Sequence, residues 1–95
     1  MLNVSQSEEK KFILHVKIPG GEACREYITK KLKELGAWAR VIVGEANVQT
    51  GAEIQLVYVE GQPGVDHLKN ARKAKAWLKD NGYPVVHEKL RSLEV

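Results

Sequence analysis

The chain consists of two similar halves, each of which reads as a strand, a helix and a second strand. Residues 32–43 and 78–86 both run from the end of a lysine-rich amphipathic helix, through a glycine and an aromatic residue, into a β-branched segment. The glycines, Gly36 and Gly82, stand where a left-handed residue commonly ends a helix. Two strand–helix–strand units within 95 residues leave few ways to build one core.

The hydrophobic pattern predicts six elements. Phe12, Leu14, Val16 and Ile18 alternate with other residues, which is the two-residue period of a strand. A helical period follows the glycine turn at residues 19–21 and returns in the second half, where the predicted inward arc is Leu68, Ala71, Ala74 and Leu78. We expect strands at residues 12–18, 38–43, 54–59 and 85–90, and helices at residues 22–35 and 65–81. The segment between the second and third strands either extends them into a long hairpin or forms a loop.

The order of the elements is βαββαβ. Right-handed crossovers in two such units produce an α+β, ferredoxin-like fold, with a four-stranded antiparallel sheet, both helices on one face, and the first and third strands in the centre. We expect a single domain over residues 12–95. Residues 1–11 are rich in Ser, Glu and Lys and are predicted to form a flexible N-terminal arm.

Composition indicates the cellular compartment and the kinds of partner that we expect. One cysteine excludes an internal disulfide, so stability comes from packing, and we expect a cytoplasmic protein. No segment approaches the ~18 apolar residues of a membrane span, so no membrane contact is expected. A net charge of +3 favours acidic partners only mildly.

The predicted strands are apolar on both faces, although only one face of such a sheet meets the helices. If Leu14 and Val41 point toward the helices, an apolar patch lies on the other face. Its members are Ile13, Trp38, Ile42, Val57 and Val59. Because a patch of this size is unusual on a monomer, we expect a homodimer whose interface is this face. A nucleic-acid or peptide ligand, or the chain's own hairpin or tail, is the alternative cover.

The second helix is basic and carries a tryptophan. Lysine and arginine bind phosphates, and an aromatic ring stacks on bases. With two cations from the sheet, this helix predicts a nucleic-acid or anion surface made of Lys17, Arg40, Lys69, Arg72, Lys73 and Trp77. We therefore expect a small binding module without a cofactor rather than an enzyme. A protein–protein assembly module with a merely solvated basic helix is the alternative.

Residues 19–25 suggest a different site. A glycine turn before a helix presents backbone N–H groups to an anion, and Arg25 adds a cation. The spacing from Gly21 to Arg25 and the later Trp38 resemble the acylphosphatase family, βαββαβ domains that hydrolyse acyl phosphates. The resemblance implies an anion loop of Gly20, Gly21 and Arg25 and, as a second alternative function, a phosphate hydrolase. The family's asparagine after the tryptophan is not matched, since Ala39 and Arg40 follow Trp38, so no catalytic residue is carried over.

Histidine and cysteine complete the candidates. His15 and His87 fall on strands that are neighbours in this fold, but no third ligand accompanies them, and we predict no metal site. Cys24 shares the inward arc of its helix with Ile28, which favours a buried, unreactive thiol.

Overall fold

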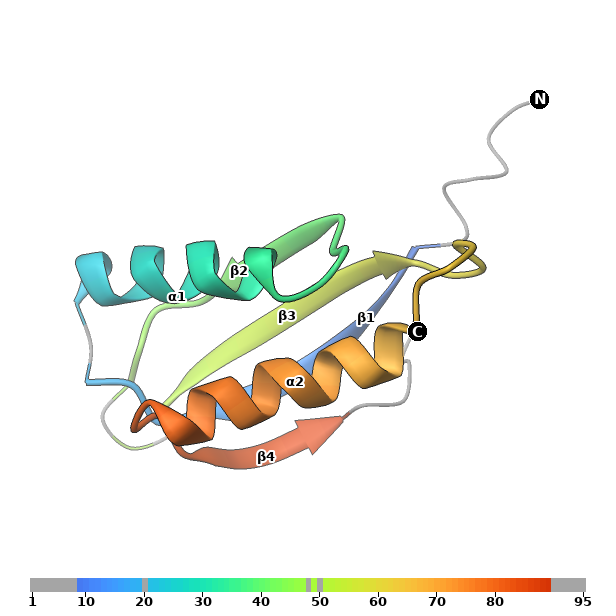
Figure 1. The fold of residues 1–95 in the computed structure, drawn as a ribbon. Coiled ribbons are helices and arrows are strands. Elements are labelled where there is room, and N and C mark those ends of the chain that lie inside the picture. The colour runs from blue at the N-terminus through green and yellow to red at the C-terminus, as the bar shows by residue number, and fades with distance from the viewer. Residues whose placement is uncertain (1–8, 20, 48, 50, 90–95) are drawn as a thin grey trace.

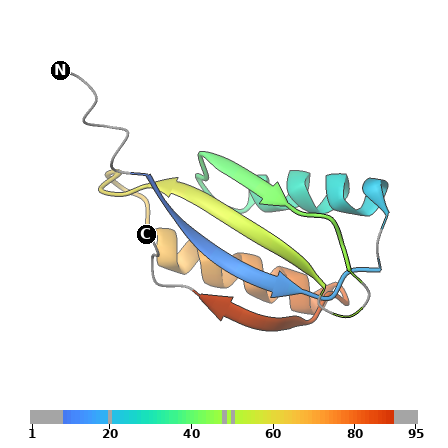
Figure 2. The ribbon, with the colours of Figure 1, turned by 180° about the vertical axis from the view of Figure 1, so that it is seen from behind.

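The computed structural model, which describes residues 9–19, 21–47, 49 and 51–89, contains the six expected elements in the expected order (Figure 1). The strands are β1 (Glu9–Val16), β2 (Arg40–Val43), β3 (Ala52–Val59) and β4 (Val85–Lys89), and the helices are α1 (Glu22–Glu34) and α2 (His67–Asp80). The strands form one antiparallel sheet in the order β2-β3-β1-β4. Both helices cover one face, and Figure 2 shows the other face open. The predicted α+β, ferredoxin-like fold is confirmed.

The first strand begins at Glu9, earlier than the hydrophobic pattern predicted. Lys10 pairs with Tyr58 and Lys11 with Val57, so residues 9–11 belong to the sheet rather than to the predicted arm. These residues carry charged side chains because this end of the strand is half exposed, and the Lys10 ammonium lies 3.4 Å from Glu60. The rest of the predicted arm, residues 1–8, lies outside the described residues.

The core lies between the sheet and the helices. Leu14 from β1, Leu56 from β3, Ile28 from α1 and Leu78 from α2 are fully buried in it. The face of α2 toward the sheet is otherwise made of small residues, Ala71 and Ala74, which bring the helix close.

Aromatic rings fill one end of the core. Phe12 stacks on Tyr58 at 4.7 Å between ring centroids, and Trp38 meets Phe12 edge-on at 6.3 Å. The imidazole of His67 stacks on Tyr58 at 4.5 Å and is buried. The helical pattern predicted Leu68 in the inward arc, but Leu68 is exposed. The reason is the helical period. His67, Ala71, Ala74 and Leu78 share the face of α2 that meets the sheet, and Leu68, one residue after His67, is turned away from that face.

The two glycines of the repeat have different roles. Gly82 has a φ of 84° and follows α2 as the left-handed residue expected there, and Tyr83 N donates to Leu78 O at 2.8 Å. Gly36 is not left-handed. A Cβ at this position would lie 2.9 Å from the Cβ of Asn70 on α2 and 3.0 Å from the indole nitrogen of Trp38. Gly36 is therefore required for close approach of the two helical segments, not for backbone conformation.

Gly36→Ala is expected to destabilise the protein by about 1–3 kcal/mol, because the new methyl group overlaps the side chain of Asn70. Urea unfolding at neutral pH measures the change. The matched control is Ala37→Ser, which adds one atom at the exposed neighbouring position. A Gly36→Ala protein as stable as the parent contradicts the packing role.

Candidate functional site

Basic side chains line the outer side of α2. Asp66 caps the helix by accepting a hydrogen bond from Lys69 N at 3.0 Å, and the buried alanines set its rotation against the sheet. As a result four cations point to solvent: Lys69, Arg72, Lys73 and Lys79. Lys75 is different, because its ammonium lies 2.7 Å from Glu88 on β4.

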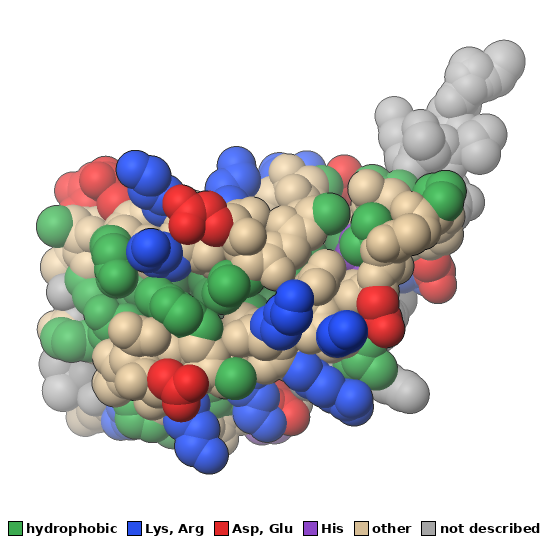
Figure 3. All heavy atoms as spheres, viewed as in Figure 1, with side chains coloured by type: hydrophobic (Ala, Val, Ile, Leu, Met, Phe, Trp, Pro, Cys, Tyr) green, Lys and Arg blue, Asp and Glu red, His purple; other side chains and the backbone are tan. Residues whose placement is uncertain are grey.

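An aromatic group adjoins this helix. The ring of Trp77 lies 6.0 Å from that of Tyr27 on α1 and 6.1 Å from that of Tyr83. Tyr27 is 48% exposed, and the other two are half-buried. Figure 3, viewed from the helix side, shows hydrophobic side chains gathered between the two helices, with Lys and Arg side chains along α2. We call Tyr27, Trp77 and Tyr83 the aromatic group.

Tyr83 is held in place by a hydrogen bond from α1. The Cys24 thiol on α1 donates to its hydroxyl at 3.9 Å. That hydrogen bond, followed by burial, raises the pKa of the Tyr83 hydroxyl, so the phenol stays neutral at physiological pH. Cys24 lies against the core, as its place in the helix predicted, but it is half-buried rather than fully buried.

The cations of α2 fall into two rows, of which one leads to the aromatic group. Lys69, Lys73 and Trp77 are spaced by four residues, so they form one row along the outer side of α2 that ends at Trp77, beside Tyr27 on α1. Arg72 and Lys79 lie on the opposite flank, above and below Lys75 and toward β4. The row of Lys69 and Lys73 therefore leads to the half-buried Trp77 and, beside it, the exposed Tyr27.

The structure does not bring together all the cations predicted from the sequence. Arg40 lies on β2, where its guanidinium is 3.3 Å from Glu9 on the open face of the sheet. Lys17 follows β1 and donates to Gln49 O at 3.1 Å. Both belong to the sheet layer, whereas the cations of α2 lie on the helix layer. The predicted single surface is thus two surfaces.

The open face is less apolar than the sequence predicted. Trp38 is 8% exposed and packs in the core instead, because β2 begins only at Arg40 and the strand period does not extend back to the tryptophan. Val57 is on the open face but only 4% exposed. Its direct neighbours across the strands are Lys11 and Arg40, whose aliphatic stems cover it.

The remaining apolar residues of that face differ in exposure. Ile13 and Val59 are half-buried, and Ile42 is 43% exposed. A shallow hollow of about 200 Å³ beside them is lined mainly by charged and polar side chains, among them Glu9, Lys11 and Gln55. Much of the predicted patch is therefore covered by the protein's own side chains, and Ile42 is its exposed member.

The segment predicted as an anion loop carries acidic neighbours. Gly21 has a φ of 93° and precedes α1, and Gly20 lies outside the described residues. Arg25 turns toward the β2 side of the helix, into a groove that it shares with Glu22 and Glu26. The two carboxylates flank the guanidinium in this groove and would repel a phosphate placed on Arg25.

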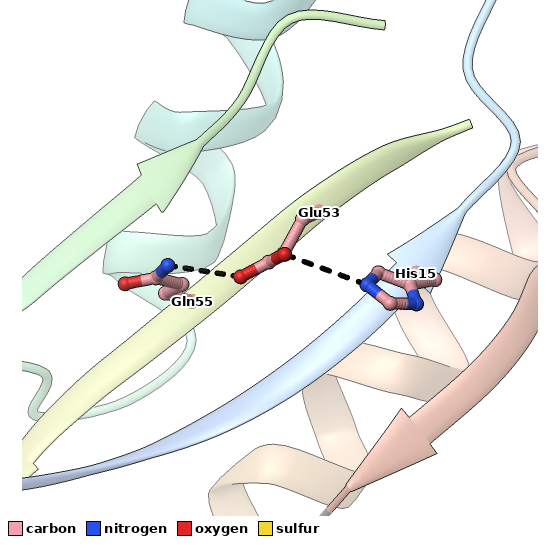
Figure 4. Close-up of polar contacts among 3 residues, drawn as sticks. All are labelled: His15, Glu53 and Gln55. Carbon is pink, nitrogen blue, oxygen red and sulfur yellow. Dashed lines mark hydrogen bonds and ion pairs between the residues drawn. The ribbon is translucent and has the colours of Figure 1, made fainter. Parts of the chain in front are cut away.

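A polar cluster occupies the open face where β1, β3 and β4 run side by side (Figure 4). Glu53 accepts a hydrogen bond from the Gln55 amide at 2.9 Å, and its other oxygen lies 3.5 Å from His15 Nε2. The rings of His15 and His87 stack at 5.6 Å. Among the described residues, no three His, Cys, Asp or Glu side chains are placed to hold a metal ion.

The hydrogen bond from Gln55 is the main cause that lowers the pKa of the Glu53 carboxyl from its usual value of 4.5. Burial opposes this effect, while His15 and Lys11 add to it. The cluster is therefore an anion held by neighbouring donors on the sheet surface.

Comparison with known proteins finds no matching family model, no similar curated protein and no similar solved structure. In the described part of the chain, neither helix is both long and apolar enough to cross a membrane. Because the comparisons found no match, the candidate site is identified from the geometry of the structure alone. Sequence reasoning found Trp77 and its lysines but missed Tyr27 and Tyr83 as partners, because the three rings come from separate segments that meet only in the fold.

The Glu53 cluster predicts a pH dependence of stability. Because the folded protein lowers the pKa of this carboxyl, Glu53 stabilises the fold above about pH 4.5, and this contribution is lost as the pH falls through the folded-state pKa. Gln55→Leu removes the main donor, so NMR titration is expected to show the Glu53 pKa rising toward 4.5. Urea unfolding of this variant should depend less on pH in the acid range. An unchanged Glu53 pKa in Gln55→Leu contradicts the assigned cause.

Proposed function

We propose that this protein binds single-stranded nucleic acid on its helix layer, with phosphates on Lys69 and Lys73 and bases on the aromatic group. The observation that carries the proposal is the line from the two lysines to Trp77, whose ring adjoins Tyr27 and Tyr83 at the surface. Lysines spaced along one side of a helix follow a phosphate backbone, and exposed rings stack on bases that have left a duplex.

A single strand fits this surface better than a duplex. Base stacking requires unpaired bases, whose flat faces are covered within a double helix. Tyr27 on α1 is exposed and Trp77 on α2 is half-buried beside it, so a base stacked on them would lie over the space between the helices, with the lysines to one side. The sheet-layer cations Lys17 and Arg40 have local partners and are not part of the proposed surface.

The role of the lysine row can be tested with two matched charge reversals. Lys69→Glu/Lys73→Glu and Arg72→Glu/Lys79→Glu change the same helix and leave the same net charge. We expect the first to weaken binding of a fluorescein-labelled oligothymidylate more than tenfold, whereas the second has a smaller effect. Fluorescence anisotropy at low and moderate salt measures both. Equal losses in the two variants would show a non-specific charge effect and contradict the proposed row.

Stacking on the aromatic group can be separated from charge. Trp77→Ala is expected to cost about 1–3 kcal/mol per stacked base while the salt dependence stays unchanged, because the phosphate contacts remain. Trp38 is buried, so Trp38→Phe leaves Trp77 as the reporter, and oligothymidylate should quench its fluorescence. Circular dichroism checks that each variant folds. Equal affinity for a duplex of the same length, or no quenching at saturation, contradicts stacking.

A further inference from the structure

The outer edge of β2 is open to pairing. β2 borders the sheet, and no other described strand pairs with its outer side (Figure 2). Its four residues, Arg40–Val43, include three β-branched residues and no proline. Edge strands with these properties pair readily with another strand unless charge, a bulge or a covering segment protects them.

The backbone register shows which groups face this edge. Gly44 N donates to Glu53 O at 2.9 Å, and Ile42 lies opposite Gln55 one step further along the ladder. In an antiparallel ladder, residues that bond to the partner strand alternate with residues that do not. Ile42 therefore bonds inward to β3, while the N–H and C=O groups of Val41 and Val43 point outward from the sheet.

The side chain of Ile42 lies at the middle of this edge. It is 43% exposed on the open face, between the two outward-pointing residues. A second β2 that runs antiparallel about a two-fold axis at Ile42 would place Val41 opposite Val43 of the other copy. The same axis would bring the two Ile42 side chains directly opposite each other, at the separation where apolar cross-strand pairs stabilise a sheet.

Helix α1 flanks the same edge and carries a self-complementary charge pattern. A groove of about 390 Å³ between α1 and Val43 is lined by Glu22, Arg25 and Glu26 near the start of the helix, and by Lys30 and Lys33 near its end. The first group carries a net negative charge and the second a positive one. The two-fold axis that pairs the strands makes the two α1 helices antiparallel. The acidic half of each helix then faces the basic half of the other.

We propose that two copies of this chain pair through β2, so that four strands from each copy form one continuous antiparallel sheet with the α1 helices side by side. This interface is the strand edge, not the open face predicted from the sequence. It is separate from the proposed nucleic-acid surface, because the charged residues of the groove lie on the β2 side of α1, whereas Tyr27 lies on the other side of this helix, against Trp77. A dimer of this kind leaves both copies of α2 accessible.

The first test is the mass in solution. Sedimentation equilibrium at high micromolar concentration is expected to give twice 10.7 kDa for the parent protein. Ile42→Lys, which places like charges opposite each other, and Val43→Pro, which removes an outward N–H, are both expected to be monomeric and folded. The matched control is Val86→Lys at the exposed apolar residue of β4, which should remain dimeric. A monomeric parent, or a dimer that persists in both β2 variants, overturns the proposal.

The second test uses the charges of α1. Glu26→Lys and Lys30→Glu each place like charges across the two-fold axis, so each variant alone should dimerise about tenfold more weakly. When the two variants are mixed, opposite charges face each other again at both positions, and the heterodimer should form with the affinity of the parent. If the two substitutions acted only within their own helix, mixing the variants would not restore the affinity. A mixture that dimerises no better than either variant alone contradicts the antiparallel placement of α1.

Discussion

Burial of one face of the central strand pair is the constraint on which the rest of the structure depends. β1 and β3 pair over their whole length, and their side chains on one face, such as Leu14 and Leu56, are completely removed from water beneath the helices. The chain has one cysteine and therefore no internal disulfide, so this layer is its main source of stability. The rotations of α1 and α2 follow from it, because Ile28 and Leu78 must face the sheet.

Those rotations decide which side chains are available for binding. With its alanines against the sheet, α2 turns Lys69 and Lys73 outward and places Trp77 against α1. The open face of the sheet is instead covered by charged stems over Val57 and by the polar cluster around Glu53. The protein thus presents a basic and aromatic surface on the helix layer and an apolar point, Ile42, at the β2 edge.

Local sequence signals predicted the elements well and their contacts less well. The strand and helix periods identified all six elements, since alternation and helical spacing are local properties. Trp38 was predicted on the wrong side because a strand period was extended past the start of β2. His67 replaced Leu68 in the core because the helix begins at a particular residue, and one position of phase exchanges a buried side chain for an exposed one.

The sequence by itself determined the order of the elements, the βαββαβ topology and the basic character of α2, because these follow from spacing and composition along the chain. Only the tertiary structure decided that Gly36 is required for close packing with Asn70, that three distant aromatic residues form one group, and that Arg40 and Lys17 lie on a different layer from α2. The physical reason is that contacts between distant segments depend on the phase and approach of whole elements, which no local pattern encodes.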